Sequence, residues 1–207
     1  TIDQLRMEYV EAFSAMYGER GFKRLWKEGR VYRNAEYDFV NVDKSSAVAA
    51  IYTGTSPSLN GIVGNVWLDR STLGVIGCVD DPNYMGNYTS ECSSPARLKV
   101  SNLSDELMIA TSGVAEVYSI APTREMAVLS AGHASKGAFW INDETGKWSG
   151  TTYYENFPSW VSSYNDRQGL DFRISEMAWG PYLPVTAYKY LTTETKQVTF
   201  KHKFDDE

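Results

Sequence analysis

The chain has few cysteines and no long apolar run, and each shortage excludes a class of protein. Its two cysteines, Cys78 and Cys92, lack the paired Cys or Cys/His spacing of a structural zinc site. Their spacing allows either a disulfide formed in an oxidising compartment or two free thiols. No apolar stretch approaches the roughly 20 residues that cross a bilayer, and the 207 residues show no signal peptide. We therefore expect no membrane span.

Positive charge is also in short supply. The 20 Lys and Arg residues are outnumbered by 26 Asp and Glu residues, which gives a net charge of −6. A nucleic-acid partner would favour a basic face, so we expect no nucleic-acid-binding surface. The hydrophobic share of 43% and charged share of 22% are typical of a globular domain with a sizeable core. Nothing in the sequence sets the oligomeric state.

Hydrophobic periodicity predicts helices and strands in alternation, which favours an α/β sheet covered on both faces. Helices are expected at residues 5–16, 21–27, 44–52, 101–112, 122–129 and 158–164, with Asp43 capping the third and Ser101 or Ser104 the fourth. Strands are expected at 31–40, at 115–121 (buried), in hairpins at 66–79 and 139–151, and in extended stretches at 185–191 and 197–204. Residues 80–97 are rich in turn-forming residues and predict a surface loop.

The most informative stretch is DKSSAVAAIYTGTSPSLNGIVGN, residues 43–65. An Ala-rich helix leads into Thr53-Gly54, then into a loop that contains Pro57, and finally into a Gly64-Asn65 turn. This stretch resembles the nucleophile helix of the alkaline phosphatase superfamily, and especially the periplasmic single-chain alkaline phosphatases and the type I phosphodiesterase/nucleotide pyrophosphatases. In that family a Thr or Ser begins the helix, and a Gly-Asn supplies an amide that holds a phosphate oxygen.

Further segments resemble the same family in the same order. They are TIDQLR at residues 1–6, GFKRL at 21–25, AGH at 131–133 and TGKW at 145–148, so the resemblance covers about residues 1–165. It implies an alkaline-phosphatase-like three-layer α/β/α sandwich. Residues 1–207 would form the N-terminal part of one such domain, with insertions at 66–100 and 138–165 that carry substrate-selecting loops.

The resemblance implies zinc-dependent hydrolysis of small phosphate monoesters or diesters at a two-metal site. In such sites two cations roughly 4 Å apart stabilise the attacking and leaving oxygens. Asp3 matches the metal ligand at the end of the family's first strand, and Asn65 matches the phosphate-oxygen donor. Arg124 lies where the phosphatases carry a Lys-x-Arg pair, whose Lys is absent here. The resemblance also implies export to the periplasm, with the signal peptide outside this chain.

The nucleophile position departs from the family. Counting back nine residues from Thr53 reaches Lys44, and an ammonium cannot replace an alkoxide. Ser45 would attack if the helix start shifted by one residue. Alternatively, the protein is a catalytically inactive phosphatase-fold binding or scaffold protein, or Lys44 holds an anion without cleaving it.

Each candidate residue also has a purely structural interpretation. Asp3 would cap a helix, Ser45 would cap backbone N–H groups, Asn65 would shape a turn, and Arg124 would be an ordinary surface residue. His133 is interpreted as structural rather than as a metal ligand. The family's remaining Asp and His ligands come from its second half and have no counterpart here, so we expect this chain to be a fragment of a longer protein.

Overall fold

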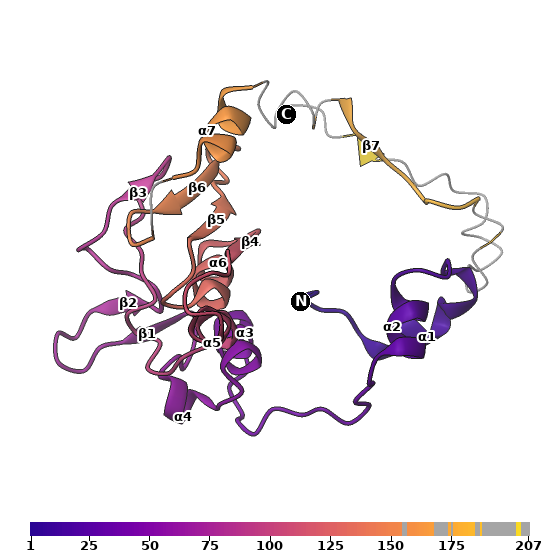
Figure 1. Ribbon diagram of the computed structural model, residues 1–207, viewed down its shortest axis with the longest axis horizontal. Helices are drawn as coiled ribbons and strands as arrows, with labels where there is room; N and C mark the ends of the chain where they lie inside the picture. Colours follow the sequence, from indigo (N-terminus) through magenta and orange to yellow (C-terminus); the bar gives the residue numbers. More distant parts are fainter. Residues whose placement is uncertain (155–156, 168–173, 175, 185–186, 188–201, 204–207) are drawn as a thin grey trace.

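The computed structural model describes residues 1–154, 157–167, 174, 176–184, 187 and 202–203 (Figure 1). Its centre is a four-stranded sheet with the strand order β3-β6-β5-β4. These strands are β3 (Gly86–Asn87), β6 (Trp148–Thr151), β5 (Gly137–Ile141) and β4 (Tyr118–Ala121). β4 and β5 run parallel, whereas β5 with β6 and β6 with β3 run antiparallel.

Helices lie on both faces of this sheet, as the alternation along β5 shows. Ala138 and Trp140 point into the core that α6 (Arg124–Ala131) shares with α3 (Lys44–Thr53). Phe139 lies between them in sequence and therefore points to the opposite face. There it contacts Trp160 of α7 (Ser159–Asp166). α5 (Leu103–Ala110) packs beside α3 and α6, which completes part of a three-layer α/β/α sandwich and confirms the predicted fold class.

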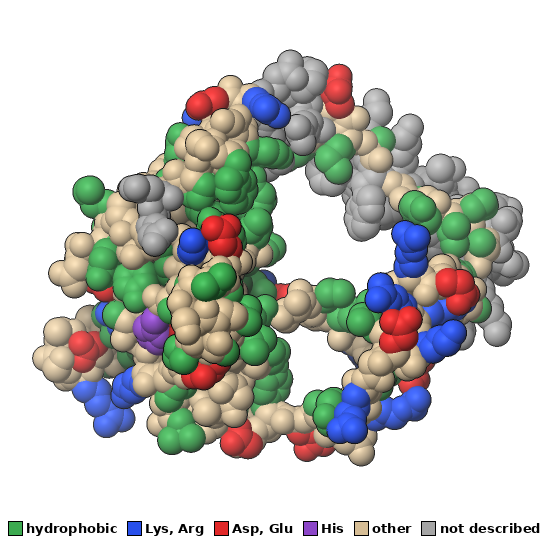
Figure 2. Space-filling view, viewed as in Figure 1, with side chains coloured by type: hydrophobic (Ala, Val, Ile, Leu, Met, Phe, Trp, Pro, Cys, Tyr) green, Lys and Arg blue, Asp and Glu red, His purple; other side chains and the backbone are tan. Residues whose placement is uncertain are grey.

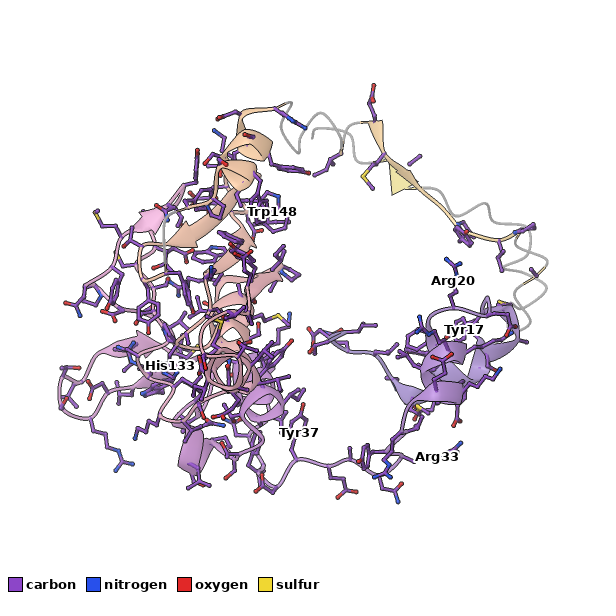
Figure 3. All side chains as sticks on the ribbon, viewed as in Figure 1. Tyr17, Arg20, Arg33, Tyr37, His133 and Trp148 are labelled. Atoms are coloured by element: carbon purple, nitrogen blue, oxygen red, sulfur yellow. The ribbon has the colours of Figure 1, made fainter. Side chains whose placement is uncertain are left out.

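The N-terminal helices lie apart from the sheet (Figure 1). They are α1 (Met7–Ala12), the 3-10 helix η1 (Ser14–Met16) and α2 (Phe22–Glu28), so the predicted helix at 5–16 is present but divided. Figure 3 places Tyr17, Arg20 and Arg33 on or beside these N-terminal helices and Tyr37 on the segment that leads to α3. Basic and acidic side chains are interspersed on the N-terminal helices (Figure 2).

The predicted strand at residues 31–40 is wrong. The segment is extended and bent but pairs with no strand among the described residues, and nearly all of it is exposed. The apolar side chains of its alternating pattern therefore have no sheet neighbours to pack against. A single extended segment without a partner gains neither the ladder hydrogen bonds nor the side-chain pairs that stabilise a strand.

Both predicted hairpins are confirmed. β1 (Val66–Leu68) pairs antiparallel with β2 (Val75–Gly77), and β5 pairs antiparallel with β6. The remaining elements are α4 (Pro57–Asn60), β7 (Ala178–Trp179) and β8 (His202–Lys203), the last two of which form a small ladder. The predicted extended stretches at 185–191 and 197–204 fall almost wholly outside the described residues. None of the helices in the described part of the chain is long and apolar enough to span a bilayer.

Three smaller predictions need correction. α5 is capped by Asn102 rather than by Ser101 or Ser104, because the Asn side chain accepts from the Asp105 N–H. α6 begins at Arg124, two residues after Pro122. The strand within 115–121 is not buried on both faces, since Ile120 is 58% exposed. The loop at 80–97 lies partly inside the molecule, because it connects core elements, and its buried members are Asp81, Ser93, Ser94 and Pro95.

The cysteines of this structure are free thiols. Burial raises the pKa of the Cys78 thiol to about 11. Cys92 is partly exposed, and its sulfur donates weakly to the Ser90 carbonyl.

A buried carboxylate joins α5 to the end of α6. Asp105 is 3% exposed and accepts from the backbone N–H groups of His133 and Ala134, both at 2.7 Å. His133 Nδ1 lies 3.0 Å from Asp105 Oδ2, and its Nε2 lies 2.9 Å from the Leu98 carbonyl oxygen. Both ring nitrogens face acceptors, which confirms the structural interpretation of His133. The contact with Asp105 raises the pKa of His133 against the effect of burial.

We expect Asp105→Ala to lower the free energy of unfolding by about 3 kcal/mol, because it leaves several buried donors without an acceptor. Urea denaturation at pH 6 measures this loss. Glu106→Ala, one residue along α5 at an exposed position, is the matched control and should change stability by under about 0.5 kcal/mol. Equal losses in the two variants would contradict the assigned role of Asp105.

The same pair gives a pH dependence. Burial opposes ionisation of Asp105, but its hydrogen bonds to His133, Asn102 and Ala134 outweigh burial and lower its pKa. Its contribution is therefore lost as pH falls below the ordinary value of 3.8. The contribution of His133, whose pKa is raised above 6.5, is lost as pH rises through that raised value. The stability deficit of His133→Ala should therefore be larger at pH 6 than at pH 9.

Candidate functional site

The first amino acids of α3 border a cavity of about 250 Å³. Its lining brings together the helix start, the Gly64-Asn65 turn and the start of α6. The lining residues are Asp43, Lys44, Ser45, Asn65, Thr123, Glu125 and Met126. Two of the residues that sequence reasoning selected, Ser45 and Asn65, therefore share one cavity.

Asp43 holds this cavity in shape. Its carboxylate accepts from the Ser46 N–H at 2.9 Å and from the Ser46 hydroxyl, which confirms the predicted N-cap of α3 and, together with the Ser46 side chain, forms a capping box. The same carboxylate accepts from the Asn65 N–H at 2.6 Å, across 22 positions of sequence. Burial opposes its ionisation, but these hydrogen bonds are stronger and lower the pKa of Asp43. Asp43 is therefore ionised at neutral pH and ties the helix start to the turn.

Ser45 is held inside the protein. Its side chain is 1% exposed, and its hydroxyl donates to Asn65 Oδ1 at 2.8 Å. The hydroxyl thus already has an acceptor within the chain.

Lys44 begins α3, and its ammonium lies 3.6 Å from Asp3 Oδ2. The two side chains are 57% and 42% exposed, so the ion pair contributes only about 0–1 kcal/mol. A second contact, from the Thr1 hydroxyl to the Tyr52 hydroxyl at 3.3 Å, also brings the N-terminal residues onto α3. Asp3 thus reaches the candidate site and meets a cation there.

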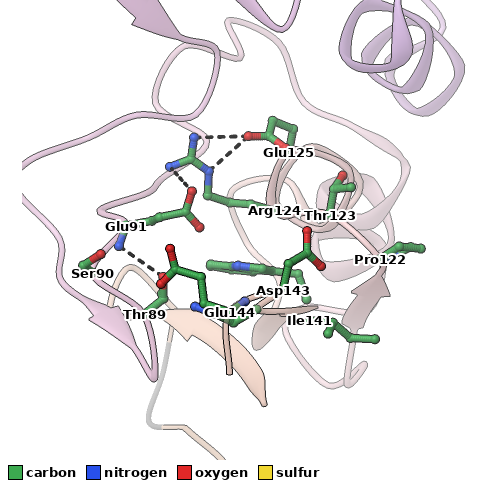
Figure 4. A pocket seen from close by; sticks show the side chains of 12 residues that line it. Thr89, Ser90, Glu91, Pro122, Thr123, Arg124, Glu125, Ile141, Asp143 and Glu144 are labelled. Carbon is green, nitrogen blue, oxygen red and sulfur yellow. Dashed lines mark hydrogen bonds and ion pairs between the residues drawn. The ribbon is translucent and has the colours of Figure 1, made fainter. Parts of the chain in front are cut away.

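Arg124 lines a neighbouring cavity of about 360 Å³ (Figure 4). Its side chain is 14% exposed, and its guanidinium lies 2.8 Å from Asp80, 3.1 Å from Glu125 and 3.5 Å from Glu91. Burial alone would lower the pKa of Arg124, but the surrounding carboxylates raise it. Asp143 and Glu144 also line this cavity, which shares Thr123 and Glu125 with the first one. The surroundings of Arg124 are therefore strongly acidic.

Sequence reasoning missed the partners of Arg124. Glu125 follows Arg124 directly in sequence, so this one acidic neighbour could have been predicted. Asp80 and Glu91 come from the loop at 80–97, which looked like surface, and no local pattern connects them to α6. The predicted residues Asp3, Ser45 and Asn65 gather around Lys44, whereas Arg124 faces the second cavity.

The described residues do not fit a zinc pair. Among them, no three His, Cys, Asp or Glu side chains are arranged to hold a metal ion. The one predicted ligand, Asp3, faces the Lys44 ammonium, which would repel a dication. Both nitrogens of His133, which could otherwise be ligands, are taken by Asp105 and Leu98.

Comparisons with known proteins agree with this arrangement of elements. A family model described as type I phosphodiesterase / nucleotide pyrophosphatase matches residues 1–206. The chain belongs to this family. It is 35% identical over 206 residues to the alkaline phosphatase PhoV of Synechococcus elongatus, and 32% identical over 192 residues to the alkaline phosphatase PafA of Elizabethkingia meningoseptica.

The matches cover most of this phosphodiesterase-family chain but a minor part of its relatives. They span 97% of the chain and 37% of PhoV, and 90% of the chain and 35% of PafA. The crystal structure of PafA superposes with a TM-score of 0.82 at 31% identity, over 90% of this chain and 37% of that one. A PafA variant with several substitutions gives a TM-score of 0.83. The alkaline-phosphatase-like fold is therefore shown, in part.

Arg124→Ala should lower the free energy of unfolding by about 1–3 kcal/mol at pH 7, because it leaves three carboxylates facing one another. The deficit should shrink at high salt, which screens the repulsion between those carboxylates. Arg24→Ala, which breaks the exposed pair with Glu28, is the control and should cost under about 0.5 kcal/mol. A deficit for Arg124→Ala that does not change with salt would contradict the electrostatic role.

Proposed function

We propose that the protein is a non-catalytic member of the phosphodiesterase family that acts by binding rather than by hydrolysis. The observation that carries this proposal is the start of α3. By the resemblance, the nucleophile position of the family falls on Lys44, whose ammonium lies 3.6 Å from Asp3. A protonated amine has no lone pair with which to attack phosphorus, so this position cannot form the covalent intermediate.

Two further features support the proposal. The nearest hydroxyl along the helix, Ser45, is 1% exposed and already donates to Asn65. The guanidinium of Arg124, which lines the neighbouring cavity, is already paired with Asp80, Glu91 and Glu125. A phosphate ester entering between the cavities would meet more carboxylates than cations, which disfavours a dianion.

Hydrolysis by the intact protein is the second candidate, and one contact favours it. Ser45 Oγ lies 2.8 Å from Asn65 Oδ1, so the hydroxyl of this candidate stands beside the residue expected to hold a phosphate oxygen. In this candidate the Ser45 hydroxyl would attack the phosphorus of a phosphate monoester or diester and displace its alcohol. Asn65 and Arg124 would stabilise the phosphoryl oxygens, and Asp3 would be a zinc ligand.

The place of the chain in the cell and in its domain is proposed from the same resemblance. We propose an exported, periplasmic protein in which residues 1–207 form the N-terminal part of one phosphatase-like domain. The segments 66–100 and 138–165 are proposed as insertions in it. Within 138–165, β5 and β6 are part of the central sheet, so inserted residues there would lie between these two strands or after β6.

The deciding assay is release of nitrophenol from p-nitrophenyl phosphate and from bis-p-nitrophenyl phosphate by the intact protein, with and without added zinc. We expect no turnover above buffer under either condition. The alkaline phosphatase PafA, assayed in parallel, controls for substrate and metal quality.

Zinc-dependent turnover of either ester that is lost in Ser45→Ala and survives in Lys44→Ala would sink the non-catalytic proposal. It would establish Ser45 as the nucleophile in place of the family position. Turnover that also survives Ser45→Ala would contradict both the non-catalytic proposal and the role of Ser45 as nucleophile.

A further inference from the structure

The cavity beside Arg124 is dominated by negative charge. Of the described residues that line it, four carry carboxylates, namely Glu91, Glu125, Asp143 and Glu144, and only Arg124 is cationic. The guanidinium already pairs with Glu91 and Glu125. Within the part of the chain that the structure describes, the carboxylates of Asp143 and Glu144 have no cationic partner. The cavity therefore holds negative charge that the protein leaves unbalanced.

The acids are held around this space by local backbone contacts. Asp143 and Glu144 belong to the turn between β5 and β6, in which the Asn142 side-chain oxygen accepts from the Glu144 N–H at 2.9 Å. In a second loop, the Glu91 N–H donates to the Thr89 hydroxyl oxygen at 3.2 Å. Figure 4 shows the three carboxylates of Glu91, Asp143 and Glu144 around the same space. Because the loops are already ordered, a ligand need not order them on binding.

The wall of the cavity also contains a buried hydrogen-bond donor with no acceptor. Trp140 lines the cavity and lies on the α6 side of the sheet, the side from which Arg124 enters it. The residue is 2% exposed, and its indole Nε1–H is buried without an acceptor among the described residues. An indole N–H can only donate, and most buried donors in proteins are paired. This donor requires an oxygen, which is a separate requirement from the cation that the carboxylates attract.

The spacing of the acids favours an organic cation over a metal ion. No three His, Cys, Asp or Glu side chains of the described residues come close enough together to hold one metal ion. An ammonium group needs no such closed shell, because its three N–H donors can meet separate carboxylates. The volume of about 360 Å³ lies at the small end of the range of about 300–1,000 Å³ found for small-molecule sites.

We propose that this cavity binds a small hydroxylated amine, of the class of amino sugars and amino alcohols. The ammonium lies among the carboxylates of Glu91, Asp143 and Glu144, and a hydroxyl oxygen accepts from the Trp140 indole N–H. The inference rests on the proposal that the protein acts by binding, and it names the ligand class for that role. The same excess of acids that repels a phosphate dianion attracts this ligand.

Calorimetric titration of the intact protein with glucosamine hydrochloride tests the inference. We expect saturable binding with a dissociation constant below about 1 mM in low salt, weakened severalfold in about 0.5 M sodium chloride. Glucose and N-acetylglucosamine keep the hydroxyls but carry no charge, so neither should give saturable heat. Cyclohexylamine carries the charge without hydroxyls and should bind about threefold to tenfold more weakly than glucosamine.

Three variants locate the binding. Glu144→Gln should weaken glucosamine binding about threefold, and the double variant Asp143→Asn/Glu144→Gln about tenfold, because each removes an unpaired carboxylate. Glu106→Gln removes an exposed carboxylate of α5 and should match the wild type. Trp140→Phe should bind glucosamine and cyclohexylamine equally, and a thermal unfolding curve checks the fold of this core variant.

The inference is overturned by absence of saturable binding, by equal binding of glucose, or by unchanged affinity in the Asp143→Asn/Glu144→Gln variant. If Trp140→Phe folds poorly, the two acid variants still decide the outcome. The proposed function fails separately. Hydrolysis of a phosphate ester by a protein that also binds glucosamine removes only the non-catalytic proposal, whereas neither hydrolysis nor glucosamine binding removes only this inference.

Discussion

The carboxylate of Asp43 is the contact on which the candidate site depends. It caps α3 through Ser46 and holds the Asn65 N–H at 2.6 Å, so a single side chain fixes the helix start against a turn 22 positions away. This contact fixes the orientation of the Lys44 and Ser45 side chains relative to the Gly64-Asn65 turn. It also satisfies backbone N–H groups that an anion would otherwise meet at a helix N-terminus.

The same pairing of donors with carboxylates recurs around the site. Lys44 faces Asp3 loosely at the surface, and Arg124 is enclosed by Asp80, Glu91 and Glu125 at lower exposure. The Arg124 cluster is the stronger of the two, because partly buried charges are less screened by solvent than exposed ones. The relatives that share this fold are alkaline phosphatases. In this chain, the cationic side chains that are candidates for binding phosphate already form ion pairs with carboxylates of the same chain.

Local sequence signals foretold the local parts of this structure well. The Asp43 cap, the α3 helix and the two hairpins each follow from a few neighbouring residues, and each is confirmed. Periodicity already favoured an α/β sheet covered on both faces, and the resemblance specified the alkaline-phosphatase-like arrangement of it. The strand expected at 31–40 failed because a strand requires a partner, and no residue within that segment reports whether a partner exists.

The chemistry of the site was less accessible to sequence reasoning, for a similar reason. Ser45 and Asn65 were both predicted as site residues. Their mutual hydrogen bond could not be predicted, because it joins residues 20 positions apart in sequence. Two of the three acids around Arg124, Asp80 and Glu91, come from a loop whose turn-rich composition predicted exposure. Charges that cancel across long sequence separations leave no local pattern, so the acidic surroundings of this site emerged only from the folded chain.

The most direct test of the account is a calorimetric titration of the intact protein with orthovanadate, which mimics the phosphoryl group in the geometry of transfer, without and with added zinc. Because the donor groups at the start of α3 and at Arg124 are already paired with carboxylates, the account predicts no saturable heat in the micromolar range under either condition. Saturable micromolar binding that is lost on substitution of Asn65 by Ala would contradict it, since that result would require a phosphoryl-binding site that remains open.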